Sequence, residues 1–167
     1  DNPYISHSIQ SMTPSTKKQA LFLAFIRYES NNDPYARPVK YWLIKNWVPW
    51  EYHSSAKGYA QSTEATWKDF NTQMADQVNY RHSYYSNIAF INWYITTKNE
   101  TIESDDYFYE AYFLYHDGKK GYANKRKNRS NTLKDYAKKI SSTAKSYHAQ
   151  LKDCKKAIQW QNQWSSL

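Results

Sequence analysis

Apolar side chains recur every three or four residues over the last third of the chain, and this spacing most limits what the chain can fold into. The recurring residues are Leu133, Ala137, Ile140, Ala144, Tyr147, Leu151, Cys154 and Ile158. A repeat that alternates between four and three residues lies on one face of an α-helix and is typical of a coiled-coil-like seam. The sequence therefore predicts a long amphipathic helix over residues 133–158.

The rest of the chain also favours helices over strands. Three glycines and five prolines stand against 17 tyrosines and 7 tryptophans, so helices with aromatic packing are expected. The apolar spacing predicts helices over residues 16–30, 63–77, 84–98 and 105–117, the last ending at Gly118 before a basic loop over 118–129. Residues 31–55 hold three prolines among many aromatic residues, which predicts a long connecting segment with room for one short helix. The expected class is mainly α, and 167 residues suit one domain.

The charge indicates which partners the chain could attract, and the cysteine content argues against disulfide and metal sites. The net charge of +8 comes from residues 117–156, which carry 13 Lys/Arg against 3 Asp/Glu. Such a block either attracts an acidic polymer, a membrane surface or nucleic acid, or is simply a solvated helix face. Cys154 is the sole cysteine and no ligand spacing suits a metal, so we expect no disulfide, metal or cofactor. No apolar run approaches a membrane span, and the N-terminus lacks the basic-then-apolar pattern of a signal peptide, so we expect no targeting segment in this chain.

Glu29 is the acid with the most unusual position. It ends an apolar stripe that includes Phe25 and Ile26, on one face of the first predicted helix. Desolvation and the negative end of the helix dipole both favour the protonated form of a carboxyl there, as a general acid requires. A buried acid paired with a nearby arginine explains the same pattern.

Three short patterns follow in order along the chain. The first is Glu29-Ser30, and the second is Gly58-Tyr59-Ala60-Gln61 with a threonine five residues after the glutamine. The third is Tyr115-His116-Asp117-Gly118, with an alanine four residues before the tyrosine. Asn87-Ile88 lies between the second and third, and Tyr136 follows the third.

Together these patterns resemble the soluble lytic transglycosylase family, the lysozyme-like SLT domain, over about residues 15–146. The family has Glu-Ser, Gly-Leu-Met-Gln and Tyr-Asn-x-Gly motifs, an Asn-Ile pair and a last tyrosine that faces the substrate. This chain departs from the family by having Tyr59-Ala60 for Leu-Met, which puts Tyr59 at a core leucine's position, and His116 for asparagine. The interval between Ser30 and Gly58 is also longer than usual. These changes concern substrate contacts rather than the reaction.

The resemblance implies a lysozyme-like helical domain of the goose-type and lytic transglycosylase kind, followed by the long C-terminal amphipathic helix. Residues 1–14 are then an N-terminal extension and 15–146 the catalytic domain, with an aromatic-rich insertion at about 34–53. Residues 147–167 form a C-terminal helical extension. This extension is a candidate surface for a protein partner, given its apolar seam and its two tryptophans.

The implied activity is cleavage of the β-1,4 bond between N-acetylmuramic acid and N-acetylglucosamine in peptidoglycan. Most glycosidases use two carboxylates, and only Glu29 is placed by a motif here. We therefore expect Glu29 to act as sole acid and base and to form a 1,6-anhydromuramic acid end. The implied substrate-binding residues are Ser30, Tyr59, Ala60, Gln61, Tyr115 and Tyr136.

Two other activities remain open at this point. One is a hydrolytic muramidase of the same fold, and the other is a non-catalytic peptidoglycan-binding module of a secretion or envelope machine. The basic block leaves a nucleic-acid-binding protein open as a third class, although no specific binding of nucleic acid is expected. Affinity for DNA that vanishes at moderate salt and lacks sequence preference would mark incidental charge attraction. The implied location is the periplasm, the cell envelope or the outside of the cell.

Overall fold

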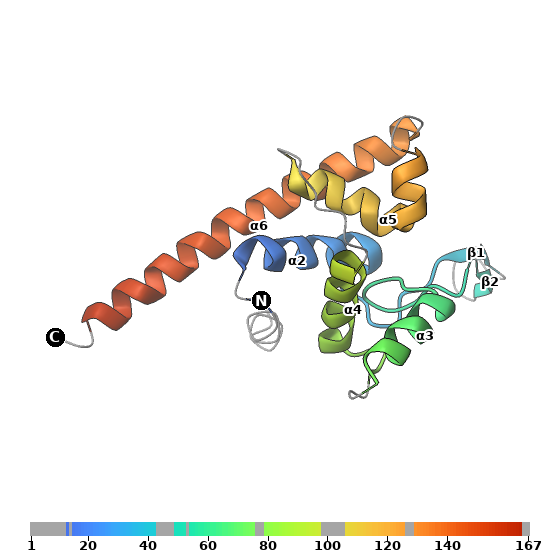
Figure 1. The fold of residues 1–167 in the computed structure, drawn as a ribbon, viewed down its shortest axis with the longest axis horizontal. Coiled ribbons are helices and arrows are strands. Elements are labelled where there is room, and N and C mark those ends of the chain that lie inside the picture. Colours follow the sequence, from blue (N-terminus) through green and yellow to red (C-terminus); the bar gives the residue numbers. More distant parts are fainter. Residues whose placement is uncertain are drawn as a thin grey trace. The chain divides into compact units, whose positions relative to one another are not determined.

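The computed structural model describes residues 13, 15–42, 49–52, 54–75, 79–97, 106–125 and 129–164. Helices account for most of them, which confirms the mainly α class. The elements in chain order are α2 (Thr16–Ser30), β1 (Val39–Trp42), β2 (Pro49–Tyr52), α3 (Glu64–Gln73), α4 (Tyr84–Thr97), α5 (Tyr107–Lys125) and α6 (Asn131–Trp164) (Figure 1).

The chain forms two compact units. Unit 1 consists of residues 1–12 and 25–99, and unit 2 of residues 13–24 and 100–167. The division passes through α2, so the first part of this helix belongs to unit 2 and its last turns belong to unit 1.

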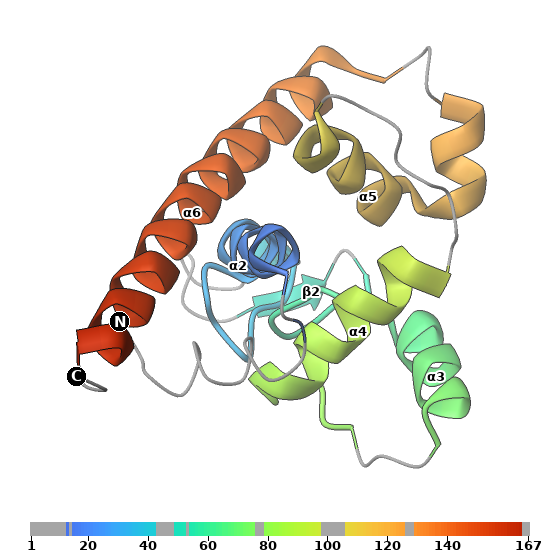
Figure 2. The same cartoon turned by 60° about the vertical axis from the view of Figure 1, so that its left-hand side comes forward.

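Unit 1 has an aromatic core where α3 and α4 contact each other (Figure 2). The rings of Phe70 and Phe90 meet edge to face with centroids 5.5 Å apart, a favourable arrangement, and Trp67 and Trp93 pack against them. The Trp93 indole N–H donates to the Gln73 side-chain oxygen at 3.0 Å, which satisfies the polar atom of a buried ring. Aromatic packing therefore joins these helices as the composition predicts.

The aromatic-rich segment of unit 1 differs from its prediction. Over its described residues it forms no helix and contains the antiparallel pair β1 and β2, with Val39 opposite Tyr52 and Trp42 opposite Pro49. Two register shifts interrupt the pairing. Tyrosine and tryptophan favour strands, and proline is tolerated at the start of a strand, so the pairing suits this composition.

Unit 2 is built around α5 and α6, and its core also includes the first part of α2. Gly118 interrupts α5 with φ 65° and ψ 173°, a conformation that is essentially restricted to glycine. The predicted helix end at Gly118 is therefore correct, but the predicted basic loop is wrong over part of its length. The helix resumes after Gly118 and continues to Lys125, and Figure 2 shows the two segments of α5 at an angle.

The long C-terminal helix is confirmed as α6, which runs well past α5 in both overall views (Figures 1 and 2). Its stripe is fully buried at Ala137, Ile140 and Ala144. Further along, Leu151 is half-buried and Cys154 is exposed. The apolar face of α6 is therefore packed in its first half and increasingly open beyond it. None of the described helices combines the length and apolar character needed to cross a membrane.

Candidate functional site

The predicted catalytic acid lies in the last turn of α2. Glu29 is half-buried there, and its neighbour Ser30 is buried with its hydroxyl donating to the Ile26 carbonyl oxygen at 2.9 Å. Two asparagines with positive φ, Asn31 at 52° and Asn32 at 63°, then end the helix. Asparagine adopts this left-handed conformation more readily than most residues, so the sequence itself specifies where the helix stops. The turn fixes Glu29 at the end of a rigid element.

The Gly-Tyr-Ala-Gln segment forms a tight loop that is bonded to the chain just after this turn. The N–H of Gly58 and the side-chain amide of Gln61 both donate to the carbonyl oxygen of Ala36, at 3.0 and 2.9 Å. The same amide also donates to the Gly58 carbonyl oxygen at 2.8 Å. A Cβ on Gly58 would lie 2.3 Å from the Arg81 carbonyl oxygen, and φ is +78°, so only glycine fits.

Gln61 therefore uses both of its amide hydrogens to hold the loop. Its side-chain carbonyl oxygen forms no hydrogen bond with the described residues and is not buried, so it can accept a hydrogen bond from a ligand. Gln61 itself has φ +46°. This unusual conformation, held by two hydrogen bonds, is a feature that clusters at ligand sites.

Asn87 joins the loop to the first turn of α4. Its side chain forms three hydrogen bonds that the sequence pattern did not predict. Its side chain is 0% exposed and accepts from the Ala60 N–H at 3.0 Å. Its amide donates to the carbonyl oxygens of Arg81 at 3.0 Å and Ser83 at 2.7 Å. Ala60 is itself buried, at 2% exposure. Asn87 thus fixes the loop to α4 through Ala60, and Gln61 fixes it to the chain after α2 through Ala36.

Tyr59 is half-buried rather than placed in the core, with its ring edge-on to Tyr84 at 5.0 Å. Burial raises the pKa of Tyr59, and the charges of Asp33 and Tyr35 act in the same direction. The phenol therefore keeps its proton at neutral pH and remains a hydrogen-bond donor. Glu29, Ser30, Tyr59, Ala60 and Gln61 all belong to unit 1.

The two other predicted site residues, Tyr115 and Tyr136, belong to unit 2, where both are half-buried. Tyr115 lies on α5 just before the interruption at Gly118. The ring of Tyr136, on α6, packs at 5.7 Å against that of Tyr112 on α5. These two tyrosines thus lie on the elements that form the core of unit 2.

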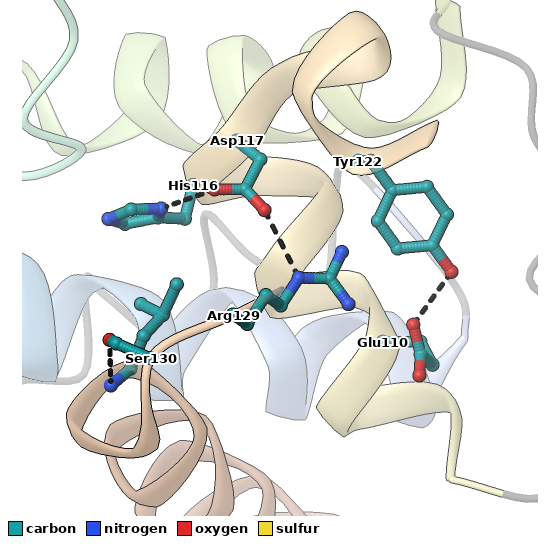
Figure 3. Close-up of polar contacts among 7 residues, drawn as sticks. Glu110, His116, Asp117, Tyr122, Arg129 and Ser130 are labelled. Carbon is teal, nitrogen blue, oxygen red and sulfur yellow. Dashed lines mark hydrogen bonds and ion pairs between the residues drawn. The ribbon is translucent and has the colours of Figure 1, made fainter. Parts of the chain in front are cut away.

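His116 and Asp117 belong to a buried ionic network that Figure 3 shows in detail. Asp117 is 1% exposed and accepts from Nε of Arg129 at 3.2 Å, while its other oxygen lies 2.9 Å from Nδ1 of His116. Burial alone would raise the pKa of Asp117, but hydrogen bonds and charges from His116 and Arg129 outweigh it and lower the pKa. The carboxylate is therefore held ionised, and it orients a histidine that is 46% exposed.

Arg129 is the residue of this network that the sequence did not single out. Its guanidinium lies 3.8 Å from the ring centre of Phe113 and 5.1 Å from that of Tyr122. Tyr122 in turn donates to Glu110 at 2.7 Å (Figure 3). In the sequence Arg129 is one cation in a basic block, and no local pattern distinguishes it from the exposed ones. Only its pairing with Asp117 does so.

Metal-binding side chains do not gather in the part of the chain that the structure describes. No three His, Cys, Asp or Glu residues come together there as they would around an ion.

Comparison with known proteins gives one match. A family model described as "Transglycosylase SLT domain" matches residues 6–154. No curated protein and no solved structure matches the chain.

Proposed function

The chain belongs to the transglycosylase SLT domain family, whose members cleave peptidoglycan outside the cytoplasm, and on this premise we propose that it is a lytic transglycosylase with Glu29 as sole acid and base. The observation that carries the proposal is the position of Glu29. It is half-buried in the last turn of α2, within the matched residues and next to a turn that the sequence specifies. The proposed location is the periplasm, the cell envelope or the outside of the cell.

The proposed reaction requires one carboxyl group and no water. Glu29 first protonates the oxygen that leaves C1 of N-acetylmuramic acid, and the C1–O bond breaks as the substrate's own N-acetyl group stabilises the positive carbon. The Glu29 carboxylate then removes the proton of the C6 hydroxyl, whose oxygen bonds to C1. The products are a 1,6-anhydromuramoyl end and a free N-acetylglucosamine 4-hydroxyl. A single group serves as acid and then as base, as in the proton exchange of retaining glycosidases.

The remaining site residues have proposed roles in holding the glycan. Gln61 offers its side-chain oxygen to a sugar hydroxyl, and Tyr59 offers its protonated phenol. Ser30 and Ala60 are buried and shape the site from beneath. Tyr115 and Tyr136, in unit 2, are proposed to bind glycan through their half-buried rings.

Mass spectrometry of the products released from purified sacculi tests the proposal. We expect anhydromuramoyl ends from the wild type and a loss of at least about a hundredfold in rate for Glu29→Gln, which cannot transfer the proton. Asp69→Asn, the same change at an exposed carboxylate of unit 1, should leave the rate intact.

Two results would contradict the proposal. Reducing ends would identify a hydrolytic muramidase. Binding to sacculi without release of products, unaffected by Glu29→Gln, would identify a non-catalytic module of a secretion or envelope machine. A partner that docks on the C-terminal helix is part of the same proposal and is detectable by its dependence on residues 147–167.

A further inference from the structure

A hollow of about 530 Å³ opens on unit 1 beside α3. Its size lies within the range of small-molecule sites. Three cationic side chains line it together with an acid and two neutral polar residues: Lys57, Lys68, Arg81, Glu64, Asn71 and Thr72. All of them belong to unit 1.

The hollow has unneutralised positive charge. One carboxylate, Glu64, stands among three cations, and none of the three forms an ion pair with any residue that the structure describes. Lys68 is exposed and Lys57 half-buried. Cations that share a concave wall raise the local concentration of anions.

Arg81 gives the strongest support for an anionic ligand. Its guanidinium donates to the carbonyl oxygens of Ser55, at 2.9 Å, and Ser62, but its Nε is buried without a partner among the described residues. Burial lowers the pKa of Arg81, although Glu64 opposes this effect. An arginine in this state is stabilised by a carboxylate or phosphate nearby.

Asn71 favours a ligand that also carries a hydrogen-bond donor. Its side-chain oxygen is buried and has no hydrogen-bond partner among the described residues. A buried polar atom without a partner is energetically unfavourable, so a ligand that brings an N–H donor is favoured. Carboxylates together with amide N–H groups are the chemistry of an acidic peptide, whereas inorganic phosphate at neutral pH brings little donor capacity.

We infer that this hollow binds the acidic peptide stem that peptidoglycan carries on its muramic acid residues. The inference rests on the proposed function, because that function makes peptidoglycan the substrate. The hollow also adjoins the loop of residues 58–61, the substrate loop, because Lys57 lines it. Lys57 pairs with Ser62 across the loop, donating its N–H to the Ser62 carbonyl oxygen at 3.3 Å, and residues 58–61 lie between them. Peptide binding there therefore acts on the loop that carries Tyr59 and Gln61.

Calorimetric titration with the synthetic tripeptide L-Ala-γ-D-Glu-L-Lys tests the binding directly. We expect saturable binding to the wild type, weakened about tenfold in Lys68→Glu and retained in Lys139→Glu, an exposed lysine of α6 with the same charge change. Lys68 is exposed, so its replacement does not disturb folding. Lys57→Glu provides a second test from the opposite side of the loop.

Three results of this titration would overturn the inference. They are equal binding of the tripeptide with its carboxylates amidated, equal binding of inorganic phosphate, and an affinity that Lys68→Glu and Lys57→Glu leave unchanged. The second result would identify a general anion site instead of a peptide site.

A second measurement separates this inference from the proposed function. We compare kcat/KM on glycan strands that carry peptide stems with kcat/KM on strands stripped of them by an amidase. The ratio of kcat/KM on strands with stems to kcat/KM on stripped strands should fall about tenfold in Lys68→Glu but not in Lys139→Glu. An unchanged ratio would overturn the peptide site while leaving the transglycosylase intact. A wild type that cleaves neither substrate would count against the proposed function, and the titration would still decide on peptide binding.

Discussion

At the scale of single residues, the loop of residues 58–61 depends on a few side chains that hold its backbone in place. Gly58 is required because both its positive φ and its approach to Arg81 exclude a Cβ. Gln61 and Asn87 form five hydrogen bonds between side chains and backbone. Two of them fix the loop to other segments, Gln61 to the chain after α2 at Ala36 and Asn87 to α4 through the Ala60 N–H. The residues that hold the loop are therefore as decisive for the site as those proposed to bind the glycan.

Replacement of Asn87 by alanine tests this support. The change removes three hydrogen bonds and leaves the buried N–H of Ala60 without its partner, so we expect a loss of about 2–4 kcal/mol in the free energy of unfolding. Asn92→Ala, the same change at a half-buried position of α4, should cost less than about 1 kcal/mol. Urea denaturation followed by circular dichroism measures both, and equal losses would show that the hydrogen bonds of Asn87 contribute nothing special.

At the scale of elements, the buried pair of Asp117 and Arg129 joins the middle of α5 to the chain just before α6. Its contribution depends on pH. The pKa of Asp117 is lowered in the folded chain, against about 3.9 for an unfolded aspartate. The ionised carboxylate therefore contributes stability that is fully present above about pH 4 and is lost as pH falls through the folded-state pKa.

Asp117→Asn removes this contribution. At pH 7 we expect a loss of about 3 kcal/mol or more, because Arg129 is then a buried cation without its partner. Between about pH 5 and pH 2 the variant should lose less further stability than the wild type does. Asp153→Asn, an exposed acid on α6, should retain the wild-type dependence. Parallel pH profiles for Asp117→Asn and the wild type would count against this view.

The elements that the sequence predicted correctly are those with a regular apolar period. Helix α2 begins at Thr16 and ends at Ser30 as its stripe and its flanking residues indicate. The length of α6 likewise follows from its four-and-three spacing. The hairpin of β1 and β2 could not be read in the same way, since strand pairing depends on a partner elsewhere in the chain.

The second segment of α5 and the role of Arg129 are further features that the local sequence pattern could not predict. Residues 119–125 are basic and lack an apolar stripe, so local pattern indicated a loop although the chain is helical there. Arg129 acquires its role only from Asp117, Phe113 and Tyr122, which lie on α5. In the site, the sequence supplied Glu29, Gln61 and the motif tyrosines as candidates, but it could not reveal which of them also hold the backbone.

At the scale of the whole molecule, α2 is the element common to both compact units. Residues 16–24 of this helix belong to unit 2 and residues 25–30, including Glu29, belong to unit 1. The helix is continuous, so its backbone hydrogen bonds cross the division. If one unit unfolds, the other loses part of a helix that contributes Phe22 to one core and Phe25 to the other. We therefore expect the two units to unfold together.

Ile140→Ala provides the test of this coupling, because Ile140 is 0% exposed and lies on α6 in unit 2. The change should lower the free energy of unfolding by about 2–5 kcal/mol through the cavity that it leaves. If α2 couples the units, native-state hydrogen exchange at Phe70 and Ile91, which are buried in unit 1, should accelerate by the same factor as exchange at Leu114 in unit 2. Acceleration confined to unit 2 would show that α2 can fray at the division. The last turns of α2, and Glu29 with them, would then stay folded with unit 1 while unit 2 opens.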